Sequence, residues 1–233
     1  MTSDLPPIPP PPPPPQDPAA DWIPFEQPGV PFFSALIETV KLFIVAPVRA
    51  FQRVPVRAEF VRPLIYAVIL GTVGSLIGFL WDSAVGDLTS RWIPQQQTGF
   101  ENVEGMEFLS GLDVLSQHSA LSVLFAPFLA AFGLFVGAAL THLFLMLVGG
   151  NMRGFFGTLR VVAYSSTSNL SAIIPLCGPF LGILWTLALS IIGLSEVHQI
   201  TKGKATLAVL LPFVLFCGCC AIFAVTVGLL GRS

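Results

Sequence analysis

The chain has 233 residues, of which 54% are hydrophobic and only 10% are charged, and its mean hydropathy is +0.80. This composition is too apolar for an ordinary soluble domain, and a formal net charge of −2 does not predict a nucleic-acid partner. The sequence therefore predicts a multi-pass membrane protein.

Residues 1–31 are rich in proline, with an unbroken run from Pro9 to Pro15. Because proline fixes φ and lacks a backbone donor, we expect a disordered cytoplasmic tail in the extended polyproline II conformation, without a packed core. Two interpretations stay open: a solvated spacer, or a ligand for an aromatic-lined groove of a partner. The tail lacks the features of a secretory signal, so we expect the first span to direct insertion.

Residues 32–62 are predicted to form an amphipathic basic segment, kinked at Pro47, because apolar residues recur at helical spacing and polar ones fall mainly on the other side. The apolar positions are Phe33, Leu36, Ile37, Val40, Phe43, Ile44, Val48 and Phe51. The segment lies either in the membrane interface or against the cytoplasmic side of the helix bundle. In the interface, anionic headgroups would attract each basic side chain by about 1 kcal/mol. The arginines concerned are Arg49, Arg53, Arg57 and Arg62.

Residues 63–231 hold five long apolar stretches. A helix needs roughly 20 mostly apolar residues to cross a hydrocarbon core about 30 Å thick. The five predicted spans are approximately 63–81, 120–148, 155–174, 180–197 and 205–230. The fold class is therefore an all-α membrane protein, a five-transmembrane-helix bundle with a preceding interfacial amphipathic helix. The alternative, buried core helices of a soluble protein, would need many more polar residues around them.

The basic residues are distributed unevenly around these spans. With the N-terminus in the cytoplasm, only Arg91 and Arg232 of the 11 Lys and Arg residues fall outside. Basic loops translocate poorly, so this count predicts a cytoplasmic N-terminus, an external C-terminus and an odd number of spans.

Three polar residues near the cytoplasmic ends of the second and fourth predicted spans form a candidate cluster: His142, Glu196 and His198. If these spans pack together, His142 is expected to meet Glu196 or His198, in a structural pairing. Solvation at the interface and half of a metal site stay open as alternatives. No metal site is predicted, because zinc needs three or four convergent ligands and residues at i and i+2 do not share a helix face.

The third predicted span is the least apolar. Arg160 lies about one turn inside it and is expected to snorkel to the cytoplasmic headgroups. A polar cluster follows, whose side chains either bond across a helix interface or line a groove. Its members are Tyr164, Ser165, Ser166, Thr167, Ser168, Asn169 and Ser171.

Several function classes lack support in the sequence. No Asp, Glu, Lys or Arg lies near the middle of a predicted span, which argues against ion-coupled transport. There is no G-x-S-x-G, P-loop, HExxH or dinucleotide fingerprint. We therefore predict no enzyme activity, no catalytic residue and no cofactor.

An ordered set of motifs runs from His142 onward: HLFLMLVGG, GFFGTLRVVAYSS from Gly154, IPLCGP, IIGLSEVH, and KATLAVLLP ending at Pro212. With these motifs the region from Phe51 to Leu230 resembles the Yip domain, a family of Ypt/Rab-interacting integral membrane proteins with many prokaryotic members. The resemblance implies five spans, a cytoplasmic N-terminus and an external or lumenal C-terminus. The motif-matching residues include His142, Gly149, Gly150, Tyr164, Pro175, Gly178, Pro179, Glu196, His198 and Pro212.

Two differences make the chain more similar to prokaryotic members. The acidic-Leu-Tyr-Gly-Pro signature of the eukaryotic branch is missing before the first span, and the proline usual after the tyrosine of the third span is replaced around Ser168 and Asn169. For eukaryotic members the resemblance implies vesicle trafficking, prenylated GTPases and membrane shaping. We expect a prokaryotic cytoplasmic membrane, with the endoplasmic reticulum or Golgi as the alternative.

The expected function is that of a non-enzymatic membrane protein that organises the bilayer or recruits partners to it. The alternative is a lipid-handling or small-solute transport protein that uses the polar face of the third span. Expected partners are anionic lipid headgroups, further copies of the chain, other membrane proteins, and a groove that binds the proline-rich tail.

Overall fold

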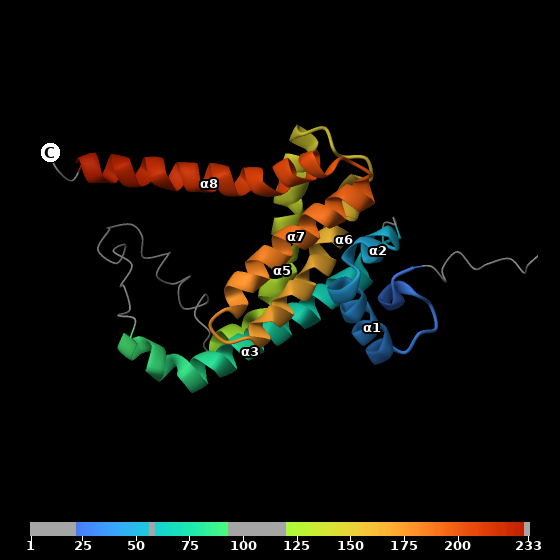
Figure 1. The fold of residues 1–233 in the computed structure, drawn as a ribbon, viewed down its shortest axis with the longest axis horizontal. Helices are drawn as coiled ribbons and strands as arrows, with labels where there is room; N and C mark the ends of the chain where they lie inside the picture. Colours follow the sequence, from blue (N-terminus) through green and yellow to red (C-terminus); the bar gives the residue numbers. More distant parts are fainter. Residues whose placement is uncertain (1–21, 56–58, 93–119, 231–233) are drawn as a thin grey trace, which may run out of the picture.

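The computed structural model describes residues 22–55, 59–92 and 120–230, and in this part of the chain every regular element is a helix (Figure 1). The α-helices are α1 Phe32–Val45, α2 Pro47–Gln52, α3 Val61–Trp92, α5 Ala120–Leu147, α6 Gly154–Ser165, α7 Gly178–His198 and α8 Lys202–Leu230. Two 3₁₀-helices, η2 Pro24–Glu26 and η3 Ser166–Ile173, complete the set. The all-α prediction is confirmed for these residues.

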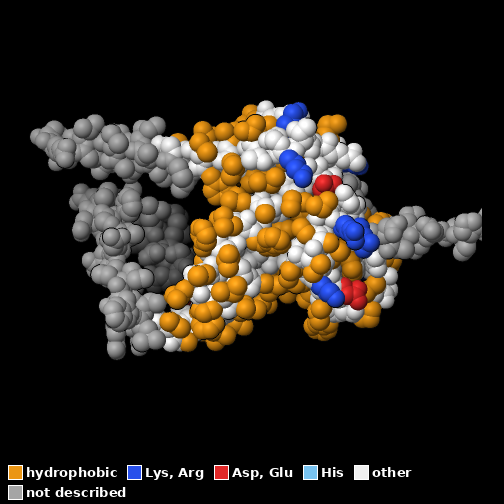
Figure 2. All heavy atoms as spheres, in the orientation of Figure 1, with side chains coloured by type: hydrophobic (Ala, Val, Ile, Leu, Met, Phe, Trp, Pro, Cys, Tyr) orange, Lys and Arg blue, Asp and Glu red, His pale blue; other side chains and the backbone are white. Residues whose placement is uncertain are grey.

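Three described helices are long and apolar enough to cross a membrane: Val61–Val85 within α3, Val123–Leu147 within α5, and α7 itself. They coincide with the first, second and fourth predicted spans. Large apolar side chains cover much of the surface seen in Figure 2. Soluble monomers rarely expose such large apolar areas, and the helices therefore belong in a membrane. The fifth predicted span corresponds to α8, which packs against α5 and α7. The count of five spans stays a prediction.

The third predicted span is not one α-helix. α6 ends at Ser165, and the chain continues for eight residues as η3. The hydroxyls of Ser166, Thr167 and Ser168 each donate to the carbonyl three residues earlier, at 2.5, 2.7 and 2.8 Å. Such side-chain bonds compete with the α-helical pattern, and 3₁₀ runs of this length are uncommon. The serine and threonine run thus changes the type of helix.

The amphipathic segment is divided at the predicted place. Ala46 separates α1 from α2, and Pro47 is the first residue of α2. A proline cannot donate to the preceding turn and disfavours α conformation in the residue before it, so the break at this position is confirmed.

The apolar residues of α1 and α2 face two different surroundings. Phe43 and Phe51 are buried in the bundle, and the Phe43 ring stacks on Tyr164 with 5.1 Å between centroids. On α1, however, Phe33 is 75% exposed and Ile37 is 66% exposed. The segment therefore packs against the bundle on one side and leaves a second apolar side uncovered.

The prediction that residues 1–31 form a tail without a packed core is wrong for residues 22–31. Ile23, Phe25 and Glu26 are buried. The Ile23 N–H donates to the Arg53 carbonyl at 3.2 Å, and the Phe25 N–H donates to the Thr39 hydroxyl at 2.9 Å. The high proline content predicted an extended tail, although the side chains of Ile23 and Phe25 are large enough to pack in a core. Residues 1–21 lie outside the described residues, where the polyproline prediction stays untested.

The prediction for Arg160 is also wrong. Its side chain is 1% exposed and forms a two-point ion pair with Glu26, with Nε 3.2 Å from Oε1 and Nη2 3.1 Å from Oε2. The Tyr164 hydroxyl donates to Glu26 Oε1 at 2.7 Å, and Arg160 also donates to the Glu59 carbonyl. Arg160 stays inside because the N-terminal segment brings a carboxylate to it, and a paired charge tolerates burial far better than a lone one.

We predict that Glu26→Ala destabilises the protein strongly. It removes the carboxylate and leaves the Arg160 guanidinium buried, which costs about 3–5 kcal/mol in comparable pairs. The measurement is the free energy of unfolding in detergent. The double variant Glu26→Ala, Arg160→Met should regain part of the loss, because it no longer buries an unpaired charge.

Glu38→Ala is the matched control for this prediction. Glu38 is exposed and accepts a 3.2 Å hydrogen bond from Ser34 on the same helix, so its loss should change stability by less than about 1 kcal/mol. Equal destabilisation by Glu26→Ala and Glu38→Ala would contradict a central role for the ion pair.

Candidate functional site

His142 on α5, Thr158 on α6 and His198 at the end of α7 form a hydrogen-bonded chain. Thr158 Oγ1 lies 2.9 Å from His142 Nδ1 and 3.1 Å from His198 Nε2. The backbone N–H of Arg153 donates to His198 Nδ1 at 3.3 Å. The two histidines therefore meet as predicted, but through a threonine.

The available protons give this chain a direction. Because His198 Nδ1 accepts from Arg153, a neutral His198 carries its proton on Nε2 and donates to Thr158. The single hydroxyl proton of Thr158 then goes to His142 Nδ1. Thr158 joins three helices at one point. The sequence does not reveal this role, because a lone threonine beside a Gly-rich turn carries no distinctive spacing.

Glu196 does not take part in this chain. Its Oε2 accepts a hydrogen bond from Gln52 Nε2 at 3.0 Å, which joins α7 to α2. The predicted alternative of a His142–Glu196 pair is therefore wrong, because residues two apart on a helix point in different directions. Within the described residues no group of three His, Cys, Asp or Glu side chains has the arrangement of a metal site.

The motif glycines and prolines lie in turns and at helix ends. Gly149 has φ +65° in the turn after α5, a conformation that glycine adopts without strain. A Cβ on Gly178, at the start of α7, would lie 2.4 Å from the Ser171 carbonyl oxygen. The other members are Gly150, buried in the same turn as Gly149, Pro175 before α7, Pro179 in its first turn and Pro212 inside α8.

The four arginines predicted to bind headgroups differ in their surroundings. Arg49 and Arg53 are exposed on and directly after α2, whereas Arg57 lies outside the described residues. Arg62 Nη1 donates to the carbonyls of Phe25 and Gln27, at 3.0 Å each. Arg62 therefore helps to hold the N-terminal segment, a role that the sequence did not reveal.

Most of the polar cluster of the third predicted span is used in packing. Ser165 donates to the Val161 carbonyl at 2.8 Å, and Ser166 bonds within the same turn. Since Ser168 donates its only proton to a carbonyl, the Thr186 hydroxyl on α7 donates to Ser168, at 2.5 Å. By the same logic Tyr66 on α3 donates to Thr167, at 2.7 Å.

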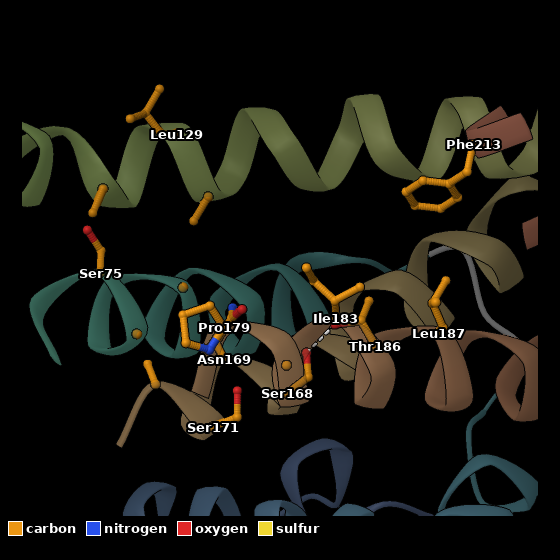
Figure 3. A pocket seen from close by; sticks show the side chains of 16 residues that line it. Ser75, Leu129, Ser168, Asn169, Ser171, Pro179, Ile183, Thr186, Leu187 and Phe213 are labelled. Atoms are coloured by element: carbon orange, nitrogen blue, oxygen red, sulfur yellow. Dashed lines mark hydrogen bonds between the residues drawn. The ribbon is translucent and has the colours of Figure 1, made fainter. Parts of the chain in front are cut away.

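Asn169 is the exception in this cluster. Its side chain is exposed, and within the described part of the chain its amide has no hydrogen-bond partner. It lines a cavity of about 610 Å³ between α3, α5, η3 and α7, with Phe213 of α8 at one end (Figure 3). The other polar side chains that line this cavity are Ser75, Ser168, Ser171 and Thr186. Ser168 therefore both bonds to α7 and lines this cavity, and the interpretation of the polar cluster as a functional groove stays a prediction.

Long apolar helices with an apolar outer surface define an integral membrane protein built from helices. The sequence profile of the Yip1 domain matches residues 41–224, and the chain belongs to the Yip1 domain family, as its motifs predicted. The match begins within α1, so Glu26, the partner of Arg160, precedes it. Neither a curated protein nor a solved structure gives a match.

We predict that Thr158→Val destabilises the bundle by about 1–3 kcal/mol, because valine keeps the shape but leaves two histidine nitrogens without their buried partner. Thr158→Ser should retain most of the stability. Thermal unfolding in detergent measures the difference.

Thr206→Val serves as the control, because the Thr206 hydroxyl bonds only to the Lys202 carbonyl of its own helix on the exposed side. Glu196→Ala should also have a small effect, below about 1 kcal/mol, because it breaks an exposed contact. A larger loss of stability from Glu196→Ala than from Thr158→Val would contradict a stabilising role for the hydrogen bonds that join His142 and His198 through Thr158.

Proposed function

We propose that the protein organises the membrane around it through a platform on α1 and α2. The platform consists of the exposed apolar residues Phe33, Ile37 and Ile44 together with Arg49 and Arg53. The single observation that carries this proposal is the uncovered apolar side of α1, directly followed by two exposed arginines. Apolar side chains of this kind insert among lipid headgroups, and the arginines attract anionic lipids by about 1 kcal/mol each.

The position of the charges supports an orientation. Figure 2 shows Lys and Arg side chains gathered toward the end of the molecule where α1, α2 and the start of α8 lie. The start of α8 contributes Lys202 and Lys204, which are both exposed. By the positive-inside rule this end faces the cytoplasm, with five spans behind it. The membrane we propose is the prokaryotic cytoplasmic membrane.

The platform is firmly attached to the bundle. Phe43 and Phe51 lie in the core beside the platform, and Glu26 and Arg160 fix the segment that leads into α1. A helix held in this way inserts at a fixed depth and angle, and so imposes its shape on the lipid. This rigidity supports membrane organisation. The family match also supports a non-enzymatic role, because the Yip1 family is one of non-enzymatic membrane proteins.

We predict that full-length protein reconstituted into vesicles with anionic lipid shifts the size distribution toward smaller vesicles as the protein-to-lipid ratio rises. The triple variant Phe33→Ser, Ile37→Ser, Ile44→Ser should lose most of this effect, because polar side chains do not insert. Cryo-electron microscopy of the vesicles gives their diameters.

The matched control is Ser34→Ala with Glu38→Ala, on the polar side of the same helix. These changes should leave vesicle size as in the unaltered protein. If the triple variant behaved like this control, the platform would not shape the membrane.

Transport along the third predicted span is the alternative to this function. Toward the α1 end of the bundle, beyond the cavity, the interior is occupied by the buried side chains of Tyr66, Arg160 and Tyr164. These side chains pack against one another and form hydrogen bonds. This packing supports binding in the cavity rather than passage through it.

We therefore predict no lipid flip-flop and no solute flux beyond the rates of protein-free vesicles. Fluorescent lipid reduction assays and radiolabelled solute uptake in the same vesicles measure both. If the unaltered protein produced lipid or solute flux and the Asn169→Leu variant did not, transport would be favoured over the proposed function.

A further inference from the structure

We propose that the cavity beside η3 binds an uncharged membrane lipid, one with a small headgroup bearing hydroxyl or carbonyl oxygens and an apolar tail. The Asn169 amide holds the headgroup. The cavity lies in the part of the bundle distant from the platform, and the proposal does not depend on the proposed function.

The size and walls of the cavity suit a lipid. Its volume of about 610 Å³ is within the usual range of small-molecule sites. Its apolar lining includes Leu129, Ile183 and Phe213, which are 41%, 58% and 56% exposed. Because these residues belong to helices that face lipid, the cavity is accessible from the hydrocarbon, where tails are available.

Asn169 and Ser75 are the polar groups of the cavity lining that have no hydrogen-bond partner within the described residues, and Asn169 is the one that carries both donors and a carbonyl acceptor. The Thr186 and Ser168 hydroxyls bond to each other, and Ser171 donates to the Gly178 carbonyl at 2.8 Å. The Asn169 amide has two donor protons and an oxygen acceptor, none of them used within the described residues. An amide left without partners in hydrocarbon is unfavourable, so an occupant with both kinds of hydrogen-bonding group would stabilise it.

The position of Asn169 is fixed by close packing. A Cβ on Gly74 would lie 2.9 Å from Asn169 Cβ and 3.2 Å from its carbonyl oxygen. A Cβ on Gly71 would also meet the Asn169 amide nitrogen, at 4.0 Å. Small residues at this spacing let α3 approach η3 closely, and the amide is held in place before a ligand arrives.

The charge of the lining selects the class of lipid. Among the described residues no Lys, Arg, Asp or Glu lines this cavity, so none of its described lining residues would neutralise a phosphate. A smaller cavity of about 200 Å³ shares Gly74 and Pro179 with it and reaches Trp81 and Asp82 near the far end of the described α3. Neutral hydroxyl or carbonyl headgroups, as in acylglycerols or isoprenoid quinones, fit the lining, and phospholipid headgroups do not.

The test uses the full-length protein in vesicles of phosphatidylethanolamine and phosphatidylglycerol. A diacylglycerol with a diazirine in one acyl chain is the probe, and phosphatidylglycerol with the same chain is its charged counterpart. After photolysis, mass spectrometry of peptides locates the label. We expect diacylglycerol to label peptides of η3 and α7, and phosphatidylglycerol to label them several-fold less.

Two variants block the site in different ways. Asn169→Leu removes the amide at similar size, and should lower diacylglycerol labelling about tenfold, as expected for one lost hydrogen bond. Ile183→Trp fills the cavity and should lower diacylglycerol labelling, although it changes no residue of η3. Leu184→Trp is its matched control, because Leu184 is 48% exposed on the same helix but does not line the cavity.

The outcomes separate clearly. Competition by unlabelled isoprenoid quinone, stronger than by unlabelled diacylglycerol, would support the proposal and identify quinones as the source. Equal labelling of the Ile183→Trp and Leu184→Trp proteins would overturn it, as would equal labelling by the two probes. Absence of label from η3 and α7 would also overturn it, because the lipid would then not occupy the cavity.

Discussion

The buried ion pair between Glu26 and Arg160 is the constraint on which the arrangement of the N-terminal half depends. Arg160 belongs to the third predicted span, and without a carboxylate it would have to reach the headgroups or leave the bundle. Glu26 supplies that carboxylate from a segment far away in the sequence, and Tyr164 adds a third hydrogen-bonding group. One consequence is that α1 and α2 are fixed against the bundle.

The third predicted span performs two tasks in its two halves. Its α-helical half, α6, carries the groups that hold other elements: Thr158 for the histidines, and Arg160 and Tyr164 for the N-terminal segment. Its second half, η3, is a 3₁₀-helix because its hydroxyls bond to nearby carbonyls. The same change of helix places Asn169 in a cavity while Thr167 and Ser168 bond to α3 and α7. Platform and cavity thus depend on neighbouring turns of one segment.

Much of the fold could be predicted from local patterns. Apolar stretches located α3, α5, α7 and α8, and Pro47 marked the break between α1 and α2. The candidate site could be predicted only in part. His142 was expected to meet Glu196 or His198. The Glu196 alternative was wrong and Thr158 was not predicted, because sequence spacing does not show which third helix lies between two others. The burial of Ile23, Phe25 and Glu26 could not be predicted because the surrounding proline content indicated an extended tail.

By itself, the sequence determined the class of this protein, its helical composition and its membership of the Yip1 domain family. These follow from apolar length and from ordered motifs, which are properties of continuous stretches of chain. Only the tertiary structure decided the partners of Arg160, Glu196 and His142, and which side of α1 stays uncovered. The reason is physical: the free energy of a buried polar group depends on the group opposite it, and here that group comes from a distant part of the chain.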